Sequence, residues 1–249
     1  MEMKKDWLQA VDIRKSRRTY TGEKIKEDTA GKIRDFVEQC NQESGLAIRF
    51  MEDGAQTFKS FSSGYGFFTG VPSYFAMAGD KDLSHLRELA GYYGELIVLE
   101  CTAKGLGTCW VSGTFNKDAC RKQIQLSDEE ELLCVIAAGP VAEKKTLKEK
   151  AIKLMALKSK KPEEFILPDS GLPQWVSMGI DAVAKAPSAM NRQPVHFAYE
   201  SGRITASVDE KLNTARIDLG IAMAHFELGA WGSLSGGKWT FENDRYLFR

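Results

Sequence analysis

The residues best suited to chemistry at the start of the chain lie in the segment 14–20, RKSRRTY. It gathers four basic side chains around one serine hydroxyl, namely Arg14, Lys15, Arg17 and Arg18 around Ser16. Guanidinium groups bind phosphate oxygens through paired hydrogen bonds, and a hydroxyl can serve a remaining acceptor. The segment therefore suits a phosphate, although an exposed basic turn would have the same composition.

A second candidate segment, 105–113 (GLGTCWVSG), places three glycines around a cysteine and a tryptophan. Glycine lets the backbone approach a flat ligand closely and leaves its N–H groups free to point at that ligand. The candidates for such contacts are Trp110, Val111, Ser112 and Gly113. A helix C-cap followed by a turn accounts for Gly105 and Gly107 equally well.

The third segment, 186–194 (APSAMNRQP), combines two prolines with short polar side chains. Pro187 fixes the backbone just after a run with helical periodicity, and Pro194 holds the preceding residue extended as a strand begins. Ser188 and Asn191 offer side-chain hydrogen bonds. The segment is either a helix-to-strand connector or one wall of a binding site.

The composition excludes several classes of function. The 249 residues include 34 Lys and Arg against 34 Asp and Glu, so no overall field favours nucleic acid or an anionic membrane. Five cysteines without metal-ligand spacing, and only three histidines, argue against structural zinc and fit a reducing compartment. No apolar run reaches the ~18 residues of a membrane span, and the N-terminal segment lacks a signal-peptide core. We therefore expect a cytoplasmic protein.

The hydrophobic pattern predicts helices and strands in similar measure. Apolar residues recur at helical spacing over 4–13, 26–42, 83–104, 173–186 and 215–230. Strand patterns cover 46–52, 73–80, 132–140, 195–201, 203–209 and 238–248. The order of helix, loop, strand pair, apolar helix with a Leu-Gly step and strand occurs in both halves, which indicates an internal duplication of an α+β unit.

The sequence lacks several well-known nucleotide-binding and hydrolase motifs. The glycines of segment 63–70, SGYGFFTG, follow the pattern GxGxxxG and precede a strand, so we reject a Rossmann site there. The sequence also contains no P-loop, nucleophile elbow or zinc-protease motif. The lysine-rich run from Lys144 to Lys161 is typical of a solvated connector.

Taken together, the three segments resemble the FMN-dependent nitroreductases. Residues 14–20 resemble the Arg-Arg-Ser-x-Arg-x-Phe opening of that family, and 105–113 its Gly-Leu-Gly-x-x-Trp-x-Gly turn. Residues 186–197 resemble its Ala-Pro-Ser-x-x-Asn-x-Gln-Pro-Trp-x-Phe segment, while 132–140 and 158–164 are similar to its late strand and following basic arm. The resemblance implies an α+β, nitroreductase-like fold with a central, mainly antiparallel sheet flanked by helices.

The order of these motifs departs from that family. Ordinary members carry the proline-serine segment soon after the arginine motif, whereas here it lies in the second half, which has no clear arginine motif of its own. Members are homodimers with the flavin at the subunit interface. The resemblance therefore implies a subfamily of two fused, diverged halves, 1–155 and 156–249, with one FMN site between them. We expect a monomer that acts as an intrachain pseudo-dimer.

The resemblance also implies a role for each candidate residue. Arg14 and Ser16, with Lys15 beside them and Lys158, Lys160 or Lys161 from the basic arm, match phosphate ligands, because FMN phosphate carries up to about two negative charges. Arg18 matches the cation near flavin N1 and the C2 carbonyl, where charge gathers on reduction. Pro187, Ser188, Ala189 and Asn191 match the loop along the ring and ribityl chain, and the stretch from Trp110 to Gly113 matches the opposite side.

The function implied is an FMN-dependent NAD(P)H oxidoreductase. A hydride would pass from NADH or NADPH through flavin N5 to a nitroaromatic, a quinone or a related small acceptor, without a catalytic side chain, since the cofactor supplies the chemistry. One alternative is a flavin carrier, sensor or flavin-modifying protein without nitroreductase turnover. Another is an interaction module whose basic run from Lys144 to Lys161 contacts an acidic partner.

Overall fold

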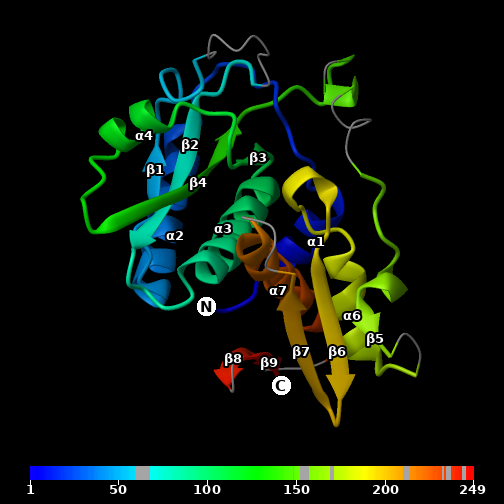
Figure 1. Cartoon of the computed structure of the whole chain (residues 1–249). Coiled ribbons are helices and arrows are strands. Elements are labelled where there is room, and N and C mark those ends of the chain that lie inside the picture. The colour runs from blue at the N-terminus through cyan, green and yellow to red at the C-terminus, as the bar shows by residue number, and fades with distance from the viewer. Residues whose placement is uncertain are drawn as a thin grey trace.

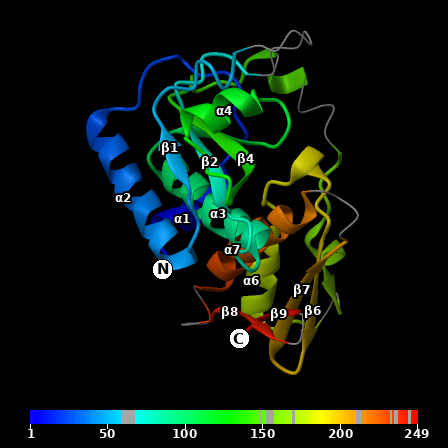
Figure 2. The same cartoon turned by 60° about the vertical axis from the view of Figure 1, so that its left-hand side comes forward.

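The strands of the molecule form two separate sheets, one from each half of the chain. The computed structural model describes residues 1–59, 68–147, 149–151, 157–168, 171–209, 214–231, 233, 237–242 and 245–249. Helices α3 (Leu86–Ala103) and α7 (Ala215–Trp231) lie side by side between the sheets (Figure 1), and the rotated view agrees (Figure 2). The expected α+β fold with mainly antiparallel strand pairing and flanking helices is confirmed, but the strands form two sheets where a single central sheet was expected.

The first sheet has the strand order β1-β2-β4-β3, and every pairing is antiparallel. Its strands are β1 (Arg49–Met51), β2 (Ser73–Asp80), β3 (Gly107–Val111) and β4 (Glu130–Gly139). The two central strands are buried over most of their length, as their continuous apolar runs require. Successive side chains point to opposite faces of these strands, so Phe75 and Ile136 face one hydrophobic cluster while Tyr74 and Val135 face another.

Helices cover the faces of this first sheet. α2 (Glu27–Ser44) and α3 pack on one face and the short α4 (Lys117–Gln123) on the other, while α1 (Lys5–Ile13) packs against α3. The glycine expected as a helix stop, Gly45, has a φ of 74°, and its N–H donates to the carbonyl of Asn41. α1 packs against α3 and buries Trp7, which places the end of α1, and hence segment 14–20, near the middle of the molecule.

The second sheet has the order β5-β6-β7-β9-β8, with β5 parallel to β6 and the other pairs antiparallel. Its elements are β5 (Ile166–Leu167), β6 (Val195–Glu200), β7 (Arg203–Val208), β8 (Trp239–Glu242) and β9 (Arg245–Phe248). Two 3-10 turns, η1 (Pro162–Glu164) and η2 (Ala189–Asn191), and helix α6 (Gln174–Val183) accompany it. Aromatic rings of Phe197, Phe226, Trp239 and Phe248 contact one another beneath the sheet.

α3 and α7 approach each other closely through a reciprocal pair of glycines. A Cβ on Gly91 would lie 2.1 Å from the carbonyl oxygen of Ile217, and a Cβ on Gly220 would lie 1.9 Å from that of Glu88. Each glycine thus faces the backbone three residues before the other glycine. Such mutual contact, in which one patch meets its counterpart, is characteristic of a two-fold interface. We call this contact the glycine seam.

Three local predictions differ from the structure. Residues 238–248 form the hairpin β8 and β9 rather than one strand, with the turn-favouring types Asn243 and Asp244 between them in sequence. Residues 107–111, expected as a turn, form the edge strand β3, because the apolar strand β4 pairs with them. β5 and α4 were not predicted at all. Most of segment 63–70 and part of the lysine-rich run lie outside the described residues.

Candidate functional site

The arginine segment runs extended beside β3, which brings two of the three sequence motifs together. Ser16 forms a parallel bridge with Thr108, and the backbone N–H of Arg17 donates to the carbonyl of Thr108 at 2.8 Å. Side chains alternate in an extended chain, so Arg14, Ser16 and Arg18 share one face and Arg17 has the other. The extended backbone therefore explains why Arg14, Ser16 and Arg18 can act together on one face while Arg17 cannot.

Cys109, on β3, shows how close these side chains are. Burial raises the pKa of the Cys109 thiol, while the charges of Arg18 and Arg14 and a hydrogen bond with Ser16 act in the opposite direction. Arg14, Ser16 and Arg18 of the arginine segment thus all act on one residue of the glycine-rich segment. They form a cationic face with a hydroxyl at its centre.

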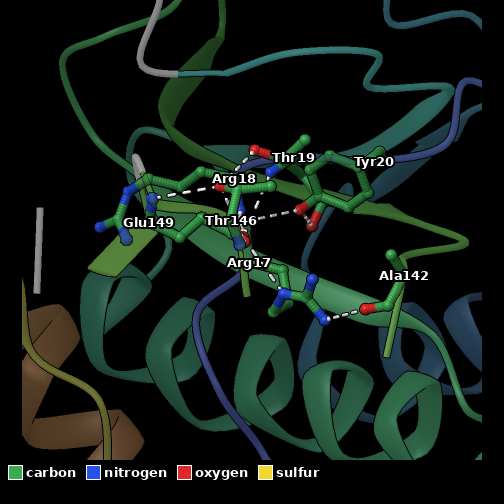
Figure 3. A network of polar contacts seen from close by, with 8 residues as sticks. Arg17, Arg18, Thr19, Tyr20, Ala142, Thr146 and Glu149 are labelled. Carbon is green, nitrogen blue, oxygen red and sulfur yellow. Dashed lines mark hydrogen bonds and ion pairs between the residues drawn. The ribbon is translucent and has the colours of Figure 1, made fainter. Parts of the chain in front are cut away.

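Arg17 points away from this face and binds Glu149, a residue that is 1% exposed (Figure 3). Its Nε lies 3.1 Å from Glu149 Oε1, and its Nη1 donates to the carbonyl of Ala142 at 2.9 Å. The same carboxylate accepts backbone N–H groups from Arg18 at 2.8 Å, from Thr19 at 3.3 Å and from Thr146 at 2.9 Å. Glu149 therefore fixes the backbone on which the cationic face is built.

The electrostatics of Glu149 follow from these contacts. Burial alone would raise its pKa, but the backbone N–H groups of Arg18 and Thr146 and the guanidinium of Arg17 outweigh burial and lower the pKa to about 2. The group is ionised throughout the physiological range. It neutralises Arg17, the arginine of this segment that points away from the cationic face.

Arg14 and Trp110 both reach toward the interior between the halves. The Nη2 of Arg14 donates to the carbonyl of Lys185 at 3.3 Å, directly before segment 186–194. The indole Nε1 of Trp110 donates to Oε2 of the buried Glu95 at 2.8 Å. The arginine segment of the first half is therefore joined to the beginning of the proline-serine segment of the second half.

The proline-serine segment is a tightly hydrogen-bonded loop. Ser188 Oγ accepts the backbone N–H of Gln193 at 2.9 Å, and the backbone N–H of Ala189 donates to Asp218 Oδ1 at 3.1 Å. Met190, Asn191 and Gln193 all have φ near +50°, a region that most residues avoid. These contacts hold a strained backbone in one shape, as is common at functional sites.

The start of the basic arm lies against this loop. Asn191 Nδ2 donates to the carbonyl of Leu157 at 2.8 Å, and Gln193 Oε1 accepts the backbone N–H of Lys160 at 2.8 Å. The Nζ of Lys160 lies 5.5 Å from the ring centre of Phe165, whereas Lys158 is exposed. The third motif and the basic arm are thus parts of one structure in the second half.

The predicted site residues differ in exposure. Val111 is buried, while Lys15, Ser112, Gly113, Lys158 and Lys161 are exposed. The cavity beside Pro187 and Ser188 measures only about 10 Å³, about the volume of one water. A larger cleft of about 480 Å³ lies elsewhere, between Lys24, Asp53 and Phe68. The hydrogen bonds of the Ser188 and Asn191 side chains are made within the protein, where they hold the shape of the loop.

The residues that sequence reasoning missed are mostly buried polar partners. They are Glu95, Glu149, Gln193 and Asp218, with Arg17 considered only as part of a basic run. The signal for Glu95 was a charge at the start of the apolar run 95–103, since a buried carboxylate requires a partner. Glu149 gave no such signal, because it lies in a lysine-rich run typical of a solvated surface.

Asp218 makes stability depend on pH. Burial raises the pKa of this carboxyl to about 7, against the opposing effects of the Ala189 N–H and the charge of Arg192. Between pH 4 and pH 7 the unfolded chain loses this proton while the folded protein keeps it, so stability falls as pH rises. We expect a contribution on the order of 3 kcal/mol between pH 4 and pH 8.

The variant Asp218→Asn keeps an acceptor for Ala189 and removes the titration. Urea unfolding should therefore depend less on pH in this variant, with a gain in stability at pH 8. Asp181→Asn, an exposed change on α6, should leave the wild-type slope intact. Identical pH slopes for wild type and Asp218→Asn would contradict the assignment.

The described residues form neither a metal-ligand cluster nor a membrane-spanning helix. No group of three or more His, Cys, Asp or Glu side chains there is placed to hold a metal ion. Across the same part of the chain, no helix has the length and hydropathy needed to cross a membrane.

Comparison with known proteins gives the fold and the family. A crystal structure described as a "putative nitroreductase" from Thermotoga maritima aligns with a TM-score of 0.64 and 23% identity, over 100% of this chain and 95% of its own. An FMN-dependent nitroreductase from Clostridium difficile aligns at 0.47 and 18% identity, over 56% and 90%. A nitroreductase with bound FMN from Bacteroides fragilis aligns at 0.47 and 16% identity, over 58% and 92%. No functionally curated protein matches the sequence.

The Thermotoga structure shows that the whole chain has a nitroreductase-like fold. A family model described as "Putative TM nitroreductase" matches residues 6–230, which is nearly the entire sequence. The chain therefore belongs to this nitroreductase family.

Proposed function

We propose that this protein is an FMN-dependent NAD(P)H oxidoreductase that reduces a nitroaromatic, a quinone or a related small acceptor. The observation that carries the proposal is the joining of motifs from the two halves. Arg14, Ser16 and Arg18 share one face beside β3, and Arg14 contacts Lys185 at the entrance to segment 186–194. Membership of a nitroreductase family supports the same reaction class.

The chemistry of the donors suits a flavin phosphate. Buried Nε of Arg14 and Nη2 of Arg17 have no hydrogen-bond acceptor among the described residues. Arg18 is partly exposed, and its side chain forms no ion pair within the described part of the chain. The unbonded Nε–H of Arg14, whose nearest carboxylate is Glu95 at 3.8 Å, and the partly exposed Arg18 favour an anionic ligand such as a phosphate, which carries up to about two negative charges.

We assign the residues as follows, with all roles part of the proposal. Arg14, Lys15 and Ser16 bind the phosphate together with Lys158 and Lys160, and Arg18 stabilises negative charge on the pyrimidine end of the ring. Pro187, Ser188, Ala189 and Asn191 form one wall, and Trp110, Val111, Ser112 and Gly113 form the other. When bound, FMN supplies the hydride chemistry at N5, and NADH or NADPH is the donor.

The two halves, 1–155 and 156–249, would then form one site as an intrachain pseudo-dimer. The glycine seam supports this, since Gly91 and Gly220 contact each other's helices reciprocally. One chain would supply what two subunits supply in a homodimer, so we propose a monomer. The free, buried thiols of all five cysteines agree with the cytoplasmic location that we propose.

An absorbance spectrum of the purified protein, followed by anaerobic titration with NADH and NADPH, tests the function. We expect bound or readily added flavin, and bleaching of its visible absorbance by at least one nicotinamide donor. A colourless protein that takes up no FMN would refute the proposal. Arg18→Ala, compared with the exposed change Lys5→Ala, should weaken bleaching selectively.

A second candidate is a flavin carrier, sensor or flavin-modifying protein. The observation in its favour is that Ser188 and Asn191 are engaged inside the protein, with a cavity of only about 10 Å³ beside Ser188. The same titration separates the two functions. FMN that binds but is not bleached by either donor would favour this second candidate.

A further inference from the structure

A fully buried carboxylate on α3 lies where three parts of the proposed site meet. Glu95 has no exposed surface, and its Oε2 accepts the indole N–H of Trp110 at 2.8 Å. Its Oε1 lies 3.8 Å from Nε of Arg14 and 2.9 Å from Nε2 of His225. Glu95 thus contacts the arginine segment, the glycine-rich segment and the second half of the chain.

His225, on α7, is also fully buried, and its hydrogen bonds fix where its protons lie. Its Nδ1 is 3.0 Å from the carbonyl oxygen of Ala182, which can only accept, so Nδ1 carries a hydrogen. The Nε2 of His225 and Oε1 of Glu95 therefore share one proton.

Trp110 and Arg14, two of the partners of Glu95, have little freedom to move. The ring of Trp110 packs on the preceding glycine, since a Cβ on Gly94 would lie 2.4 Å from its Cη2. Arg14 is held at its other end by the carbonyl of Lys185. Buried carboxylates with complete hydrogen bonding fix their neighbours strongly, because losing a partner leaves a charge or a polar group uncompensated.

We propose that Glu95 and His225, the interhalf dyad, are positioning residues for the FMN site. Glu95 orients Arg14 toward the phosphate and fixes Trp110 in β3, and His225 ties both to the second half. The dyad touches neither the flavin nor the reacting atoms. This inference rests on the proposed function, because it concerns two residues assigned to FMN.

The test is a double-mutant cycle on FMN affinity, with apoprotein titrated by flavin fluorescence. Glu95→Gln removes the charge but keeps the shape, and we expect the Kd for FMN to rise about tenfold, because Arg14 loses the carboxylate that lies 3.8 Å from its Nε. Because Glu95 acts in part through Arg14, adding Glu95→Gln to Arg14→Ala should raise the Kd by clearly less than Glu95→Gln raises it in the wild-type background. Fully additive losses, or an unchanged Kd in Glu95→Gln, would overturn the inference.

Glu227→Gln is the matched control. Glu227 is another buried carboxylate at the contact of α3 with α7, where its Oε2 accepts the hydroxyl of Tyr92 at 2.9 Å. We expect this variant to keep the wild-type Kd within about twofold at a comparable loss of Tm. Equal effects of the two variants on Kd would make Glu95 merely structural. If Glu95→Gln does not fold, His225→Gln carries the test with the same expected direction.

One readout does not need flavin. The indole N–H resonance of Trp110, assigned with Trp110→Phe, should move upfield in Glu95→Gln, because a neutral amide oxygen is a weaker acceptor than a carboxylate. A wild-type protein that binds no FMN would refute the proposed function. An indole resonance that does not move would refute the proposal that the dyad fixes Trp110, whether or not the protein binds FMN.

Discussion

Replacing Glu149 with alanine is expected to lower the free energy of unfolding by about 3–5 kcal/mol, the cost of breaking a buried ion pair from one side. The change leaves the buried guanidinium of Arg17 without its carboxylate and removes the acceptor for backbone N–H groups of Arg18 and Thr19. Urea unfolding at pH 7 measures the loss. FMN binding should weaken as well, since these residues carry the cationic face.

Acid provides a second measurement on the same residue. The pKa of Glu149 is lower in the folded protein than in the unfolded chain, so its contribution is complete above pH 4.5 and disappears as pH falls toward 2. Glu149→Gln should therefore lose less stability than wild type over that range. Glu143→Ala, an exposed change just before the lysine-rich run, should cost less than about 0.5 kcal/mol. Equal losses in the two alanine variants would contradict the structural account.

The variant Gly220→Ala is expected to destabilise the protein by about 3 kcal/mol, despite the better helix propensity of alanine. Its Cβ would lie 1.9 Å from the carbonyl oxygen of Glu88, so α3 and α7 must move apart. This carbonyl oxygen belongs to the backbone of α3, which cannot move aside as a flexible side chain can. Thermal or urea unfolding measures the effect, and Gly91→Ala should behave in the same way.

A matched control lies in α2, at Gly31. The nearest atom to a Cβ there is Nη2 of Arg34 at 3.9 Å, so the site has room. Gly31→Ala should stabilise the protein by about 0.5–1 kcal/mol, because alanine loses less entropy in a helix. If Gly220→Ala is as well tolerated as Gly31→Ala, the close approach of α3 and α7 is wrong.

The longer elements of the fold could be predicted from sequence because their periodicity is strong. α2 with its stop at Gly45, the buried strands β2 and β4, and the hairpin of β6 and β7 all lie where the pattern placed them. The short elements β5 and α4 have too few residues for a pattern. The strand β3 was missed because the glycines of segment 105–113 suggest a turn, whereas pairing with β4 decides its conformation.

For the candidate site as well, local motifs could be predicted from sequence, whereas contacts between distant segments could not. Segments rich in arginine, glycine or proline were visible because each residue type has its own local chemistry. The contact of Arg14 with Lys185 joins segments far apart in the chain, and only the resemblance to a dimeric family suggested that these segments meet. Glu149 was not found because nothing in a lysine-rich run distinguishes a buried glutamate from a solvated one.

The glycine seam has a consequence for the order of folding. Each sheet has a hydrophobic cluster assembled mostly from its own half, whereas the seam joins helices whose sequences lie far apart. Closing such a long loop costs chain entropy before any contact is gained, so the seam should form late, after both sheets. Mutations at Gly91 or Gly220 would then speed unfolding while leaving the folding rate nearly unchanged. The lifetime of the native state, more than the speed of reaching it, depends on those two residues.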